Sequence, residues 1–388
     1  TVMLPTNFAA ATYNANNVVL MLTPVPVTPS APTSFTWTGP TSGTAFWSNP
    51  ANWGGIVPTN GTTVIIPSLS GALTIVYDTN AGTLNITSLQ NSENLSVTGG
   101  SLSLGSLLAD TSNFALGSGL GLSGGTFGGA GTINMLGDFN WTGGTLAGTG
   151  LLDLSNATSA VFNGNLTQNG MTVRLANLNI ANNSVYTLNG GTLSTTATTN
   201  TNTLNNGSQL NLNGGNLSTT TPLSVNGAIN WSGSGLNMGT STLTISPTGE
   251  LNITANNSLT AGSLNNQGTL IKTAGNGTSN LNTTLNNSGT VDIQSGQINT
   301  TGYTQTAGTT TLNNTTLQSN NININSGALK GTGRLNGNLN LGNGAQLAPG
   351  QSPGTLTITG DLQMDPGSTT QIEIAGTSAG SQYDQIQV

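Results

Sequence analysis

The sequence predicts an all-β protein, a right-handed parallel β-helix (β-solenoid) with an aromatic N-terminal cap and irregular strand segments at both termini. Short runs of alternating apolar and polar residues recur along the chain, separated by Gly- and Asn-rich turns. The phrase LNNQGTL at 264–270 returns as LNNSGTV at 285–291, and LNGGTLSTT at 188–196 returns as LNGGNLSTT at 212–220. These offsets of 21 and 24 residues fit an irregular coil of three short strands and three turns.

The alternating runs also predict which side chains face the interior. In runs such as Leu251-Asn252-Ile253 and Leu339-Asn340-Leu341, the apolar residues share one face of the strand and Asn occupies the other. If identical phrases lie one coil apart, Asn stacks on Asn, and each amide can bond to its neighbours above and below. We therefore expect outward Asn ladders around an aliphatic interior.

The amino-acid composition limits the classes of function that the chain can have. The chain has 388 residues, with four Lys and Arg, eleven Asp and Glu, and neither His nor Cys. With so few cations we expect no nucleic-acid binding, and no apolar run is long enough for membrane insertion as a helix. Catalysis by Ser-His-Asp or Cys-His sets is ruled out by composition, as are soft-metal sites. We expect no catalytic residue, cofactor or metal, although stacked coils could align distant carboxylates such as Asp138 and Asp153.

Five segments follow one another along the chain. Residues 1–22 are expected to form a terminal strand segment that completes a neighbouring unit, with one strand over Asn17–Leu22. Residues 23–34 contain closely spaced prolines and form a linker. Residues 35–67 form a Trp-rich cap, residues 68–346 the β-solenoid rod, and residues 347–388 a C-terminal edge or junction segment.

Tryptophans have two interpretations in this chain. Trp37, Trp47 and Trp53 can bury their rings in a cap over the open end of the solenoid, or expose them as a platform for sugar rings. The cap is favoured because turn residues lie among them. Farther along, Trp141 and Trp231 stand in similar Gly-flanked phrases and are expected in the core or along a groove.

A family resemblance rests on the C-terminal segment. The phrases PGQSPGTLTITGDL at 349–362 and IEIAGTSAGSQYDQIQV at 372–388 resemble the repeat associated with autotransporter passenger domains and giant bacterial surface adhesins. The stretch 268–298 also looks like solenoid segments of such proteins. In that family further strands normally follow the phrase that ends here at Val388, and their ending is similar to residues 4–22 of this chain. The resemblance provides no catalytic residues.

This permuted order has two explanations. The chain is a unit of covalent tandem repeats, or separate copies associate head to tail and residues 1–22 of one add a strand to the open C-terminal edge of the next. Eight apolar residues are the candidates for this self-association: Val18, Val19, Leu20, Leu22, Ile372, Ile374, Ile386 and Val388.

The expected function is therefore a non-enzymatic structural or adhesive β-solenoid that is secreted or held on the surface of a Gram-negative bacterium. It would act as a stalk or filament subunit. One alternative is a carbohydrate-binding adhesin module that binds surface glycans through exposed Trp or Asn side chains. A polysaccharide-degrading β-helix enzyme is the other.

Overall fold

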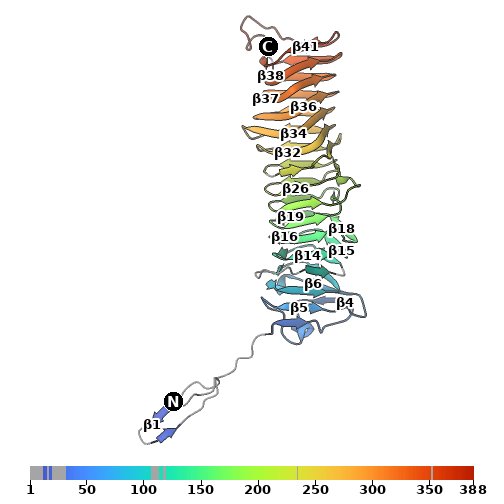
Figure 1. Cartoon of the computed structure of the whole chain (residues 1–388), viewed down its shortest axis with the longest axis vertical. Coiled ribbons are helices and arrows are strands. Elements are labelled where there is room, and N and C mark those ends of the chain that lie inside the picture. The colour runs from blue at the N-terminus through green and yellow to red at the C-terminus, as the bar shows by residue number, and fades with distance from the viewer. Residues whose placement is uncertain are drawn as a thin grey trace.

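The computed structural model is a long parallel β-solenoid of about 14 turns, and Figure 1 shows its coils stacked along one axis. The structure describes residues 12–14, 17–19, 32–105, 113–116, 119–233, 235–350 and 353–388. All strands from β3 onward belong to one sheet of 41 strands, whose named strands pair in parallel. The predicted fold class is confirmed. Two short 3-10 helices, η1 (Pro50–Trp53) and η2 (Thr79–Ala81), interrupt the first coils.

From β5 to β31, each coil contributes one strand to each of three faces, whereas the first coil contributes only β3 and β4. Face 1 contains β3 (Ser34–Thr36), β5 (Thr63–Ile66), β8 (Ser88–Asn91), β11 (Asn113–Leu116), β14 (Thr132–Met135), β17 (Leu151–Leu154), β20 (Thr172–Leu175), β23 (Thr192–Thr195), β26 (Asn216–Ser218) and β29 (Gly235–Asn237).

Face 2 contains β4 (Gly43–Phe46), β6 (Leu73–Tyr77), β9 (Asn94–Val97), β12 (Leu120–Leu122), β15 (Asp138–Trp141), β18 (Ser159–Phe162), β21 (Asn179–Ile180), β24 (Asn202–Leu204), β27 (Leu223–Val225) and β30 (Thr242–Ile245).

Face 3 contains β7 (Thr83–Ile86), β10 (Ser101–Leu104), β13 (Thr126–Gly129), β16 (Thr145–Gly148), β19 (Asn165–Asn169), β22 (Val185–Leu188), β25 (Gln209–Leu212), β28 (Ala228–Trp231), β31 (Glu250–Ile253), β33 (Thr269–Lys272) and β35 (Thr290–Ile293).

Toward the C-terminus the strands lengthen and bend around corners. The long strands are β32 (Ser258–Asn266), β34 (Thr278–Asn287), β36 (Gln297–Gln305), β37 (Thr309–Ile324) and β38 (Gly327–Leu341). The last strands are short again: β39 (Ala345–Pro349), β40 (Thr355–Ile358), β41 (Leu362–Met364), β42 (Thr369–Thr370) and β43 (Gln385–Gln387). Because β39 to β43 pair onto the coils beneath them, the ladder continues past residue 346.

The register follows the repeated phrases. Leu264 pairs with Leu285 and Asn265 with Asn286, and Leu188 pairs with Leu212. Both repeats predicted from the sequence therefore lie one coil apart. Most apolar residues of the described strands point inward and are almost completely buried, including Trp141 and Trp231, which belong to the core.

Side-chain ladders run along the rod. Amide pairs join successive coils at donor–acceptor distances of 2.7–3.0 Å, with the donor named first: Asn189–Asn169, Asn205–Asn179, Asn213–Asn189, Asn230–Asn211, Asn266–Asn287, Asn286–Asn265, Asn299–Asn280 and Asn340–Asn323. The expected Asn ladders are present. The pair Asn266–Asn287 is the exception to their expected orientation, because it is buried inside the rod.

Glycines stack at one corner, where successive turns approach closely. A Cβ added at Gly268 would lie 2.3 Å from the carbonyl oxygen of Gly249, and one at Gly289 would lie 2.2 Å from that of Gly268. The column continues with Gly308 and Gly327, whose φ angles are +73° and +81°. Only glycine combines this backbone conformation with such close packing of turn on turn.

An aromatic cluster closes the N-terminal end. Trp37, Trp47 and Trp53 are buried, and the Trp37 and Trp53 rings meet edge to face with centroids 5.0 Å apart. The Trp53 indole nitrogen donates to the carbonyl oxygen of Trp47 at 2.7 Å. Since β3 pairs with β5 and β5 with β8, this cap is also the first part of the solenoid stack.

Candidate functional site

The C-terminal end of the rod is unsealed, in contrast to the N-terminal end. Met364 pairs with buried Leu341 and so lies on the core side of its strand, yet its side chain is 43% exposed. Ile386 pairs with buried Leu356 and is only partly buried. Within the described residues no further coil covers these side chains.

The terminal strands also present open backbone edges. Within the described part of the chain, β41, β42 and β43 each pair with only one strand, in the coil beneath. Ile372, Ile374 and Val388 lie exposed around this end. Parallel strands with a free edge can accept a strand from another chain. This end is the first candidate site.

Asp384 fastens the last segment onto the rod. Its buried carboxylate accepts hydrogen bonds from the backbone N–H groups of Gly354 and Glu373, each at 2.8 Å. The carboxylate oxygens are thus occupied by backbone donors, which assigns Asp384 a structural role.

The predicted N-terminal strand differs in detail from the structure. β1 (Thr12–Asn14) and β2 (Asn17–Val19) form an antiparallel hairpin in which Tyr13 pairs with Val18. The hairpin is a separate two-stranded sheet. Val18 and Val19 belong to it, whereas Leu20 and Leu22, and linker residues 23–31, lie outside the described residues.

The sugar platform proposed for the cap tryptophans lacks the necessary exposure. Trp37, Trp47 and Trp53 are only 4%, 1% and 5% exposed. Stacking on a sugar requires an open ring face. The three rings instead pack on one another and, through Trp47, on Tyr77.

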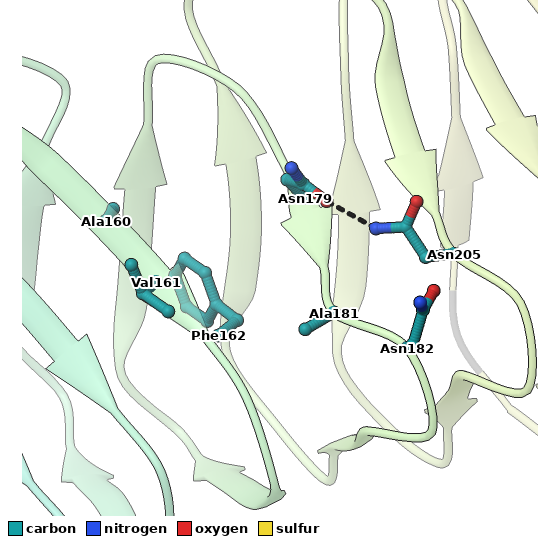
Figure 2. A pocket seen from close by; sticks show the side chains of 7 residues that line it. All are labelled: Ala160, Val161, Phe162, Asn179, Ala181, Asn182 and Asn205. Atoms are coloured by element: carbon teal, nitrogen blue, oxygen red, sulfur yellow. Dashed lines mark hydrogen bonds between the residues drawn. The ribbon is translucent and has the colours of Figure 1, made fainter.

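A second candidate site is a groove on face 2, where successive coils separate (Figure 2). The groove has a volume of about 350 Å³ and is lined by Ala160, Val161, Phe162, Asn179, Ala181, Asn182 and Asn205. Figure 2 shows Val161 and Phe162 across from the three amide side chains. Val161 has an apolar side chain, yet 44% of the residue is exposed to solvent.

The groove follows from a local interruption of the ladder. β18 pairs with β15 over four residues below, but with β21 above only at Phe162 and Ile180. A turn after β21 carries Asn183 with a φ of +58°, a left-handed conformation that Asn tolerates better than most residues. This turn places Asn182 beside the groove.

The two acidic residues that the sequence suggested as an aligned pair lie on different faces of the rod. Asp138 pairs with Ser159 on face 2, whereas Asp153 pairs with Arg174 on face 1, so the alignment of Asp138 with Asp153 considered from the sequence is wrong. Partial burial raises the pKa of Asp153, but bonds from Ser155 and Arg174 outweigh it and lower the pKa overall. Among described residues no group of three or more acidic side chains could hold a metal.

Searches against protein-family models, curated proteins and solved structures find no match to this chain. The described residues include no helix long and apolar enough to cross a membrane.

The groove on face 2 was not among the sites predicted from the sequence. A usable signal was present in Ser159-Ala160-Val161-Phe162, where alternation places Val161 outward at a position that most coils fill with a polar residue. The loss of strand pairing above β18 depends on the coil geometry and has no comparable signal.

Proposed function

We propose that the protein is a non-enzymatic structural β-solenoid of the bacterial cell surface that acts as a stalk or as a subunit of a head-to-tail filament. The observation that carries this proposal is the difference between the two ends of the rod. The N-terminal end is closed by three buried tryptophans, whereas core-side Met364 and Ile386 are solvent-accessible at the other end.

Strand complementation is the mode of association that we propose. An isolated two-stranded hairpin is only marginally stable in water, so the β1–β2 hairpin gains from joining a larger sheet. The terminal strands β41 and β43 have free parallel edges that can accept it. Burial of exposed Ile374 and Val388 under the added strand would contribute further stabilisation.

A low charge density and a polar outer surface suit a passive rod. The chain has only four basic residues, and its outward ladders consist mainly of Asn, Thr and Ser. The location on a cell surface rests on the resemblance of residues 349–388 to repeats of bacterial surface adhesins.

Negative-stain microscopy of the full chain tests the assembly. We expect end-to-end filaments that disappear when residues 1–22 are removed, and also when Ile374 is replaced by Asp. Leu136→Asp is the matched control, because Leu136 is 53% exposed on the side of the rod and should leave filaments intact. Isolated short rods in all samples would contradict assembly by strand complementation and favour covalent tandem repeats.

A further inference from the structure

We propose that the groove on face 2 binds a neutral saccharide, with the outward-facing Val161 under the apolar face of a sugar ring and Asn179, Asn182 and Asn205 bonded to its hydroxyl groups. This inference does not depend on end-to-end assembly. The groove volume of about 350 Å³ lies within the roughly 300–1,000 Å³ range of small-molecule sites.

The apolar side of the groove is the first argument. The exposed large hydrophobic residues cluster at the two ends of the rod, except Leu136 and Val161 within the described rod body. Val161 lines the groove, and the neighbouring Ala160 is partly buried. A pyranose ring carries C–H groups on its faces, and these can cover such a surface without losing hydrogen bonds to water.

The floor beneath Val161 is closely packed. Phe162 is 1% exposed and packs against Trp141 and Tyr186, with ring centroids 5.9 Å from each. Burial raises the pKa of the Tyr186 hydroxyl, which donates to the side-chain oxygen of Gln168. This packed aromatic cluster fixes the wall of the groove before any ligand arrives, which lowers the entropic cost of binding.

The polar side of the groove is also held in place. The Asn205 Nδ2 atom donates to Asn179 Oδ1 at 2.7 Å (Figure 2). It also donates to the carbonyl oxygen of Ile180 at 2.8 Å. This arrangement leaves the Asn205 Oδ1 and Asn179 Nδ2 atoms as one acceptor and one donor for a ligand. Asn182 is exposed and adds a third amide on the same side.

The absence of charged side chains in the groove narrows the class of ligand that it can bind. None of the seven lining residues is ionisable, so the groove has no cation for an acidic polysaccharide or a phosphate. Paired donors and acceptors next to an apolar surface instead match a neutral hexose or N-acetylhexosamine. A second, more polar groove lined mainly by Asn, Gln, Thr and Ser lacks an exposed apolar side chain of this kind and serves as a comparison.

The test is calorimetric titration of the full chain with neutral hexose and N-acetylhexosamine oligosaccharides of four to six units, and with polygalacturonate as the acidic comparison. We expect binding of at least one neutral oligosaccharide. Val161→Ser and Asn182→Ala should each weaken it about three- to tenfold, the effect of losing one apolar contact or one neutral hydrogen bond.

Two further variants separate the groove from general effects on the ladder. Asn205→Ala and Asn286→Ala each remove the donor of an amide pair on face 2, at 2.7 and 2.9 Å, but only Asn205 lines the groove. Asn205→Ala should weaken binding and Asn286→Ala should not, with melting temperatures measured for both. The proposal is overturned if no neutral oligosaccharide binds, if only polygalacturonate binds, or if the groove variants bind as tightly as Asn286→Ala.

Discussion

Asn286 donates a hydrogen bond through its Nδ2 atom to Asn265 Oδ1 at 2.9 Å, one coil below. The two residues occupy equivalent positions of the repeated phrase. Because Asn265 pairs with Thr244 of β30, both stand on the outer surface of face 2. The next residue in each strand turns inward, and there Asn266 donates to Asn287 at 2.8 Å within the rod. One phrase thus builds an exposed ladder and a buried one.

Asn287→Ala should lower the stability of the rod more than Asn286→Ala. Asn287 is 1% exposed, accepts from Asn266 and from the Gly289 N–H, and donates to Gln305. Its loss leaves buried polar groups unpaired, which costs about 1–3 kcal/mol, whereas an exposed amide pair contributes roughly 0.5–1.5 kcal/mol. Urea denaturation followed by circular dichroism compares the two midpoints. Equal midpoints would contradict the difference in burial.

Gly308→Ala should be strongly destabilising. The added Cβ would lie 1.9 Å from the carbonyl oxygen of Gly289, and the φ of +73° is unfavourable for alanine. Backbone strain of about 1–2 kcal/mol adds to overpacking of about 1–3 kcal/mol. Gly239→Ala is the control, because its φ is +56° but nothing lies within 4 Å of the added atom. Its melting temperature should fall far less, and a similar fall in both variants would exclude the close packing as the cause.

Lys272 should make the folding stability of the rod vary with pH in the alkaline range. The residue is fully buried, and its ammonium donates to the carbonyl oxygens of Ala255 and Ala274 at 3.2 and 2.9 Å. Burial lowers its pKa below the ordinary 10.5. The folded state therefore binds fewer protons than the unfolded state between the lowered pKa and 10.5, and stability rises with pH across that window.

Lys272→Met measures this effect. The variant should lack the rise in stability with pH that the parent shows up to about pH 10, when both are compared by urea denaturation. Above that pH the buried tyrosines Tyr77, Tyr186 and Tyr303, whose pKa values are raised by burial, act in the opposite direction. Lys330→Met, at an exposed position on face 3, should retain the parent's profile. Parallel profiles for the parent and Lys272→Met would refute the assignment.

Trp47→Ala should open the N-terminal end. Trp47 is 1% exposed and contacts both Trp53 and Tyr77, with ring centroids at 4.9 and 5.5 Å. Removing a buried aromatic side chain costs about 3–5 kcal/mol. Because coils of a solenoid contact only their neighbours, hydrogen exchange should accelerate mainly in the first coils. The neighbouring Phe46, 49% exposed, provides Phe46→Ala as the control, which should leave exchange unchanged.

The sequence alone determined the class of fold and much of the register. Alternating runs and near-identical phrases are local features, and a parallel stack satisfies all of them at once by placing Leu264 on Leu285 and Leu188 on Leu212. The same logic predicted the outward Asn ladders. The assembly and cell-surface roles inferred from residues 349–388 stay predictions.

Only the tertiary structure decided which side chains point inward at the corners of the rod and which are buried at its ends. Whether an Asn beside a turn points outward, as Asn265 does, or inward, as Asn266 does, depends on how the chain bends there. Burial of Trp37, Trp47 and Trp53 likewise depends on coils contributed by later residues. The groove beside Val161 exists because β18 and β21 pair at a single position. Alternation specifies the faces of a strand, but the separation of neighbouring coils is set by all the turns between them.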